Sequence, residues 1–342
     1  MKKKLLSALL STMLLLVTAA CSGGSNAPTQ VSPSQRPTDS APSAQTPTAP
    51  DPAPPTTTED WPEIPESAWE YQYSAEYGGI EITKYNPVSN ILRVRIPDTF
   101  DGLPVVSIGT RVFEKVGAVE VYLPSTVVNI ANFAFMDSAI TSIAFPEGLL
   151  KIGNRAFRDC VGLTSVILPD SLLELDGESV FSGCTGLTSV TIGSGLKRIE
   201  TTTFKGCTSL ADISIPSTVQ YVAHSAFHDT AFWFSQPDGW VYLDSWLLGY
   251  KTEDEQESPV VSDADILVQD GTMGIASGAF FYILLSGETN YSATPFRLRL
   301  PDSVIFFSIG DMRRMETITY RGVVYERYQD SFPDEFYTLF QD

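Results

Sequence analysis

Residues 163–181 of this 342-residue chain read LTSVILPDSLLELDGESVF, and this stretch decides the fold. Val166 and Leu168 alternate at a period of two, so both side chains face one side of a short strand. Pro169 has no amide hydrogen for a ladder and ends that strand. Leu175 and Phe181 then supply apolar groups on the way back. One such coil cannot bury these groups alone, whereas stacked coils can cover each other.

The same unit recurs along the chain. Its phenylalanines are spaced 22, 22, 24, 23 and 23 residues apart, at Phe113, Phe135, Phe157, Phe181, Phe204 and Phe227. A proline or its substitute precedes each by about eleven residues in the clearest copies, at Pro124, Pro146, Pro169, Gly193 and Pro216. Nine strands are predicted, ending at Ile96, Leu123, Phe145, Leu168, Ile192, Ile215, Val268, Leu300 and Tyr320. Stacking would place these strands parallel in one sheet, ~4.8 Å apart.

The unit Leu-x-x-Val/Ile-x-Ile/Leu-Pro-x-x-Val/Leu-x-x-Ile-x-x-x-Ala-Phe resembles the BspA-like, or treponemal-type, leucine-rich repeat. The resemblance covers residues 91–321. It implies an α/β-type solenoid with a parallel sheet on one face and irregular turns or short helices on the other. The period also falls within the ~20–29 residues of leucine-rich repeats.

Three segments depart from the repeat. Residues 61–90 and 322–342 are rich in aromatic residues and are predicted to cap the two ends, because open sheet edges need covers. Residues 228–262 interrupt the period and are predicted to hold a hairpin insertion that turns at Asp244-Ser245.

The N-terminus has the pattern of an export signal. Lys2 to Lys4 precede an apolar run, residues 5–17, that is shorter than the ~20 residues of a membrane span. Ala19-Ala20-Cys21 follows and resembles the lipobox of bacterial lipoproteins, which implies removal of residues 1–20 and acylation of Cys21. Ordinary secretion with an unmodified Cys21 is the alternative. Residues 22–60 hold 9 Pro, 7 Thr and 6 Ser without an aromatic residue, so residues 21–60 are predicted to be a lipidated cysteine and a disordered linker.

Charge and composition exclude some functions. The chain has 41 acidic and 22 basic residues, a formal net charge of −19, which disfavours nucleic acid as a partner. With two histidines and four cysteines, little material remains for metal sites. The sequence contains no Gly-x-Ser-x-Gly, phosphate loop or His-Glu-x-x-His motif. We therefore expect no metal, no cofactor and no enzymatic activity.

Cys160, Cys184 and Cys207 each follow a repeat phenylalanine by three residues. They should form a ladder through successive coils, as small buried packing residues. A single disulfide between neighbours is the alternative, because Cα atoms in adjacent coils lie within disulfide range. His224 and His228 flank Phe227 and are expected to have a surface role rather than to bind metal.

The outward side chains of the predicted sheet form the candidate binding face, because solenoids present extended faces to partners. Its middle is lined by serine and threonine, and each end carries two arginines. The candidate residues are Arg93, Arg95, Tyr122, Ser142, Ser165, Ile167, Ser189, Thr191, Asp212, Ser214, Arg297 and Arg299.

Relatives with this repeat are associated with adhesion to host or matrix proteins and to other bacteria. The resemblance therefore implies a lipoprotein anchored to the cell membrane and exposed at the cell surface, whose solenoid binds an extracellular protein or glycan. Two alternatives remain. One is a cell-envelope carbohydrate-active enzyme that uses paired carboxylates, and the other is a structural spacer of the envelope.

Overall fold

The computed structural model describes residues 61–223, 225–252, 260–261, 265–280, 284–285, 296–307, 315–327 and 332–340. The chain divides into two compact units, residues 1–55 and 56–342, and every described residue belongs to the second. The predicted signal peptide, Cys21, the linker up to residue 60 and His224 lie outside the described residues.

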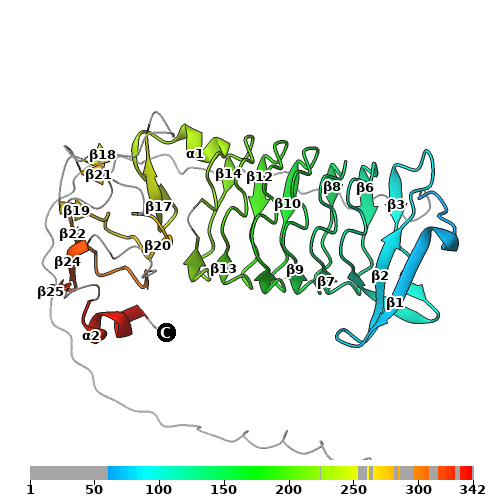
Figure 1. Ribbon diagram of the computed structural model, residues 1–342, viewed down its shortest axis with the longest axis horizontal. Coiled ribbons are helices and arrows are strands. Elements are labelled where there is room, and N and C mark those ends of the chain that lie inside the picture. The colour runs from blue at the N-terminus through cyan, green and yellow to red at the C-terminus, as the bar shows by residue number, and fades with distance from the viewer. Residues whose placement is uncertain are drawn as a thin grey trace, which may run out of the picture. The chain divides into compact units, whose positions relative to one another are not determined.

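Each of the nine predicted strand positions carries a strand, so the predicted solenoid is confirmed (Figure 1). Consecutive strands pair in parallel within three sheets, β3-β6-β8, β10-β12-β14 and β19-β22-β24. We call these strands the front column: β3 (Arg93–Arg95), β6 (Glu120–Tyr122), β8 (Ser142–Ile143), β10 (Ser165–Ile167), β12 (Ser189–Thr191), β14 (Asp212–Ile213), β19 (Asp265–Leu267), β22 (Phe296–Arg299) and β24 (Met315–Tyr320). The prediction of one continuous sheet is wrong, because no pairing among the described strands joins β8 to β10 or β14 to β19.

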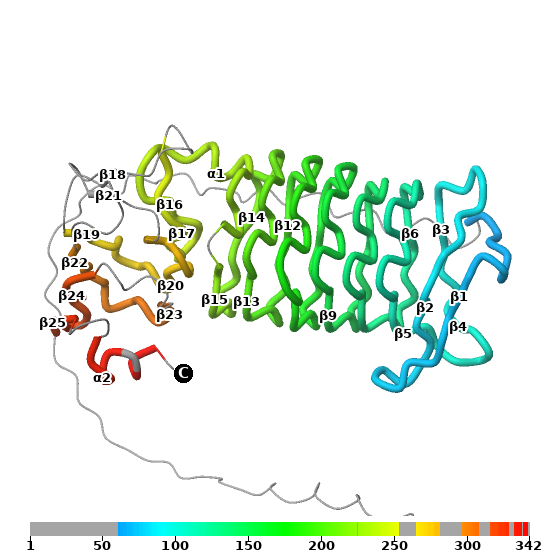
Figure 2. The backbone as a smooth tube through the Cα atoms, in the orientation of Figure 1, coloured from blue at the N-terminus to red at the C-terminus, as the bar shows by residue number. Residues whose placement is uncertain are grey.

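A second column of parallel strands runs along the return side of the coils, which the sequence did not predict. Most of these strands have two residues, too few to show an alternating pattern. The column comprises β5 (Leu103–Ile108), β7 (Asn129–Ile130), β9 (Lys151–Ile152), β11 (Glu174–Leu175), β13 (Arg198–Ile199), β15 (Tyr221–Val222), β20 (Gly274–Ile275) and β23 (Phe306–Phe307). Strand pairing therefore joins neighbouring coils on the return side as well as on the front. Figure 2 shows the coils running side by side.

The six repeat phenylalanines stack in one column inside the coils. Consecutive ring centroids lie 4.9, 5.0, 5.3, 5.7 and 5.7 Å apart, with interplanar angles of 5–11°. All six side chains are buried. The stack arises because each phenylalanine occupies the same place in its coil, so the register read from the sequence is correct.

A hairpin covers the first coil. The 3₁₀ helix η2 (Glu66–Ala68) leads into β1 (Trp69–Ser74), which pairs antiparallel with β2 (Gly79–Tyr85). Strand β2 then pairs in parallel with β5, so the hairpin extends the return column. The long return of the first coil holds β4 (Thr99–Phe100), which turns back onto β5.

The period break after Phe227 contains a short helix and a hairpin. Helix α1 (Ala231–Ser235) begins at Thr230, whose hydroxyl accepts a hydrogen bond from the Trp233 amide. Strands β16 (Gly239–Leu243) and β17 (Trp246–Lys251) pair antiparallel and turn at Asp244-Ser245. Because β17 also pairs in parallel with β20, the hairpin replaces one member of the return column.

The C-terminal part closes the front column with β25 (Val323–Glu326), which pairs antiparallel with β24. A small pair lies nearby in the sequence, β18 (Val260–Val261) with β21 (Leu284–Leu285). Helices α2 (Asp334–Tyr337) and η4 (Thr338–Phe340) follow. Phe332 and Phe336 are buried in a second apolar core shared with Phe280, Phe296 and Tyr320.

Candidate functional site

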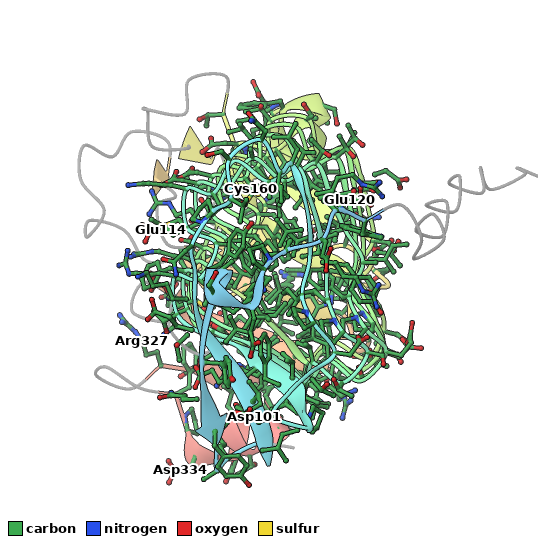
Figure 3. The ribbon with its side chains drawn as sticks, turned by 90° about the vertical axis from the view of Figure 1, so that its right-hand side faces the viewer. Asp101, Glu114, Glu120, Cys160, Arg327 and Asp334 are labelled. Atoms are coloured by element: carbon green, nitrogen blue, oxygen red, sulfur yellow. The ribbon has the colours of Figure 1, made fainter. Side chains whose placement is uncertain are left out.

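The candidate face consists of two columns of outward side chains on the front strands. Register pairs Arg93 with Glu120 and then Ser142, Ser165 with Ser189 and then Asp212, and Asp265 with Arg297. The second column pairs Arg95 with Tyr122, Ile167 with Thr191, and Leu267 with Arg299. All twelve predicted residues are exposed or half-buried, including Ser214 after β14. Figure 3 looks onto the end that carries β1 and β2, where Glu120 and Glu114 lie on opposite sides.

The N-terminal end of the face is an arginine–aromatic cluster. The Arg93 guanidinium lies 4.5 Å from the Trp61 ring centroid, and its Nε lies 2.8 Å from a Glu120 carboxylate oxygen. Arg95 lies 4.0 Å from the Tyr122 ring centroid, and its Nη2 lies 3.1 Å from Asp98. Trp61 was not predicted because it lies outside the repeat, and Asp98 was not predicted because it follows the strand and is not one of its alternating residues. Both arginines are therefore held in place and their charges are offset.

The middle of the face is lined by hydroxyl groups in two arrangements. Thr141, Thr164 and Thr188 each donate a hydrogen bond to a backbone carbonyl of the preceding coil, at 3.1, 3.3 and 3.0 Å. These threonines precede Ser142, Ser165 and Ser189, which lie in the outward column. The threonine hydroxyls link coils, whereas the serine side chains face outward between the two charged ends.

At the C-terminal end of the face, the two arginines differ in their contacts with carboxylates. Arg297 Nε and Nη2 donate to the two carboxylate oxygens of Asp265, at 2.7 and 3.3 Å, and Nη1 lies 3.9 Å from Glu316. The hydrogen bonds to Arg297 lower the pKa of Asp265, and the same contacts raise the pKa of Arg297. Arg299, in the neighbouring row, makes no direct ion pair with a carboxylate among the described residues, although its charge also helps to lower the pKa of Asp265.

The carboxylates at the two ends of the face are paired with arginines. A glycosidase needs a carboxylic acid whose pKa is raised, and the pKa of Asp265 is instead lowered. Glu120 and Asp98 also form ion pairs, with Arg93 and Arg95 respectively. Among the described residues, no group of three or more His, Cys, Asp or Glu side chains could hold a metal ion.

The cysteine ladder is structural. Cys160, Cys184 and Cys207 are buried free thiols (Cys160 is labelled in Figure 3). Each Sγ donates to a phenylalanine carbonyl of the preceding coil, at 3.1 Å, the acceptors being Phe135, Phe157 and Phe181. Burial raises the pKa of Cys184, so its thiol stays protonated and is a poor nucleophile.

Comparison with known proteins identifies the repeat. Residues 90–232 match the model of the BspA type leucine rich repeat region, in six copies. Residues 90–232 therefore consist of BspA-type leucine-rich repeats. No protein among those with curated descriptions matches the sequence.

Solved structures of leucine-rich repeat proteins are similar to the chain. The leucine rich repeat protein of T. pallidum is 27% identical with a TM-score of 0.39, over 47% of this chain and 86% of that one. A leucine rich cell surface protein from Faecalibacterium prausnitzii A2-165 is 23% identical with a TM-score of 0.41, over 76% and 77%. The pneumococcal vaccine antigen PcpA is 20% identical with a TM-score of 0.44, over 76% and 70%.

Within the part of the chain that the structure describes, the helices are short. None has the length and apolar character needed to cross a membrane.

Proposed function

We propose that the chain is an extracytoplasmic binding protein whose front column presents its outward side chains to a protein or glycan. The observation that carries the proposal is the separation of the two sides of the front strands. The inward residues, such as Val94, Val166 and Leu298, are buried, whereas every predicted face residue retains exposure. A face of this kind suits recognition of an extended macromolecule.

The proposed location is the outer side of the cell membrane, with Cys21 as the acylated anchor. The basic start, the short apolar run and the Ala-Ala-Cys step support it. A proline-rich linker of 39 residues would separate the domain from the lipid. Two or more acyl chains give stable attachment, whereas one gives only marginal binding.

The anchor is tested by Cys21→Ala in cells. We expect radiolabelled palmitate to enter the unchanged protein but not the variant, and the variant to leave the membrane fraction. Equal lipid labelling of the two proteins would contradict the proposed anchor.

The binding face is tested by a matched pair in one coil. Ile167, on β10, is 45% exposed, and Leu173, just before return strand β11, is 56% exposed. Each is replaced by Arg, and both variants are applied to arrays of extracellular matrix proteins and glycans. We expect Ile167→Arg to weaken binding of any array ligand at least tenfold and Leu173→Arg to leave it unchanged.

Two outcomes would contradict the proposed face. One is equal loss in the two variants, and the other is loss with Leu173→Arg alone. Thermal unfolding serves as the control, because exposed substitutions should leave Tm close to that of the unchanged protein.

A further inference from the structure

The four arginines of the face differ in what surrounds them. Arg93, Arg95 and Arg297 each contact a carboxylate at 2.7–3.1 Å. Arg299 is exposed and makes no such direct contact among the described residues. Its charge helps to lower the pKa of Asp265, but Asp265 lies in the neighbouring register and hydrogen-bonds to Arg297. Arg299 therefore retains its full capacity for a planar, bidentate interaction with a carboxylate from outside.

Exposed apolar side chains lie in the same row. Across the strands, Leu267 is opposite Arg299, Arg299 is opposite Thr319, and Thr319 is opposite Val324. Leu267 is 71% exposed and Val324 is 56% exposed. We call Leu267, Arg299, Thr319 and Val324 the Leu267 row. An unpaired cation between exposed apolar side chains can bind a charged group and exclude water around it.

We propose that the Leu267 row binds an acidic, partly apolar segment of a protein partner. The proposal rests on the proposed function and assigns the partner class to one end of the face. Charge complementarity supports it, because Arg299 is an exposed cation without a direct ion pair among the described residues, on a chain of net charge −19. The aliphatic Leu267 and Val324 side chains offer apolar contact but no hydrogen bonds, which suits a peptide better than a sugar.

The N-terminal cluster is a poorer candidate for the same partner. Glu120 and Asp98 already neutralise its arginines, and an acidic segment would have to displace them. Arg93 also lies over Trp61 and Arg95 over Tyr122. The two ends of the face thus differ in available charge, although each has two arginines.

The test uses a random peptide library panned on the immobilised protein. Selected peptides are synthesised, and their affinities are measured by fluorescence anisotropy. We expect the enriched sequences to carry Asp or Glu between apolar residues. We expect Arg299→Gln to weaken their binding at least tenfold. The matched control is Arg198→Gln on return strand β13, where Arg198 contacts a carboxylate and an aromatic ring, and it should change binding less than twofold.

A charge swap tests whether Arg299 itself contacts the acidic residue of the peptide. Arg299→Glu should abolish binding of a selected peptide, and a peptide whose acidic residue is replaced by Lys should recover it. Leu267→Ser is the second variant and should weaken the same peptides without a change in the charge requirement. Thermal unfolding should show no difference in Tm, because none of these side chains is buried.

Four outcomes would overturn the inference: no enriched peptide, a consensus without acidic residues, equal effects of Arg299→Gln and Arg198→Gln, or no recovery in the charge swap. The proposed function can survive each of them. Ligands that respond to Ile167→Arg but not to Arg299→Gln, glycans included, would retain the face and reject the Leu267 row. Ligands that respond to neither would reject both.

Discussion

The coils of residues 113–227 and those of residues 265–320 use the same front strands but pack their aromatic cores differently. In the first region, six phenyl rings stack with interplanar angles of 5–11°. In the second, Phe280 and Phe296 are 6.1 Å apart and tilted by 45°, and Phe280 meets Trp240 edge-on at 5.3 Å. Even spacing in the sequence produces a registered column, and uneven spacing produces an irregular core.

The difference shows which feature sets the regularity. Both regions have parallel ladders on the front and return sides. Hydrogen bonding is therefore common to both, whereas the ring column belongs to the evenly spaced region. We infer that the constant return length, rather than the strands, aligns the core.

The largest effect is expected from Phe157→Ala. Phe157 is fully buried between Phe135 and Phe181. Because the two strand columns prevent collapse of the cavity, the substitution should lower the free energy of unfolding by ~3–5 kcal/mol. Phe280→Ala should lower the free energy of unfolding by less than Phe157→Ala does, because an irregular core can relax around the cavity. Urea unfolding of both variants measures the difference, and a larger loss for Phe280→Ala would reverse the comparison.

A smaller effect is expected where coils approach each other closely. A Cβ at Gly186 would lie 2.4 Å from the Val161 carbonyl oxygen, whereas one at Gly148 would lie 3.8 Å from the Ser125 oxygen. Gly186→Ala should therefore lower the free energy of unfolding by ~1–3 kcal/mol. Gly148→Ala should be neutral or slightly stabilising. Equal stability of the two variants would show that the coils are not spaced as described.

The smallest effect concerns pH. Hydrogen bonds from the Ser194 amide and hydroxyl, at 2.8 and 3.0 Å, lower the pKa of Asp170. A lowered pKa stabilises the fold above the unfolded value of ~3.9 and loses that contribution as pH falls through the folded pKa. Asp170→Asn should therefore reduce Tm at pH 7, with a difference that shrinks on acidification.

Asp265→Asn provides the counterpart in the irregular region, because Arg297 lowers the pKa of Asp265. Its Tm difference should shrink over the same acidic range, with the same sign. A difference that grows on acidification in either variant would contradict the assigned hydrogen bonds.

The sequence predicted the front column well and the return column not at all. The alternation of Val166 and Leu168 before Pro169 predicts the strand directly, and the spacing of the phenylalanines predicts the register of the coils. Return strands such as β9 have two residues, and their pairing depends on the neighbouring coil rather than on any local pattern. The strands exist because stacked coils bring these backbones together.

The sequence predicted that the candidate residues share one side of the front strands, but it did not predict their charged partners. Alternation predicted Arg297 and Arg299 on one face, and nothing in the repeat pattern distinguished the surroundings of one from those of the other. The partners that separate them come from other coils: Asp265 is 32 residues before Arg297. Trp61 likewise joins the face from outside the repeat. The pattern within one repeat could not predict contacts between residues that are far apart in the sequence.

Amide hydrogen exchange tests most directly whether residues 113–227 act as one registered stack. We predict that interior coil amides, such as those of Phe157 and Leu168, exchange slowest and at a common rate, since stacked coils open cooperatively. The amides of Val268 and Leu300, which make equivalent hydrogen bonds, should exchange faster. Equal or greater protection of Val268 and Leu300, or scattered rates within 113–227, would contradict the account.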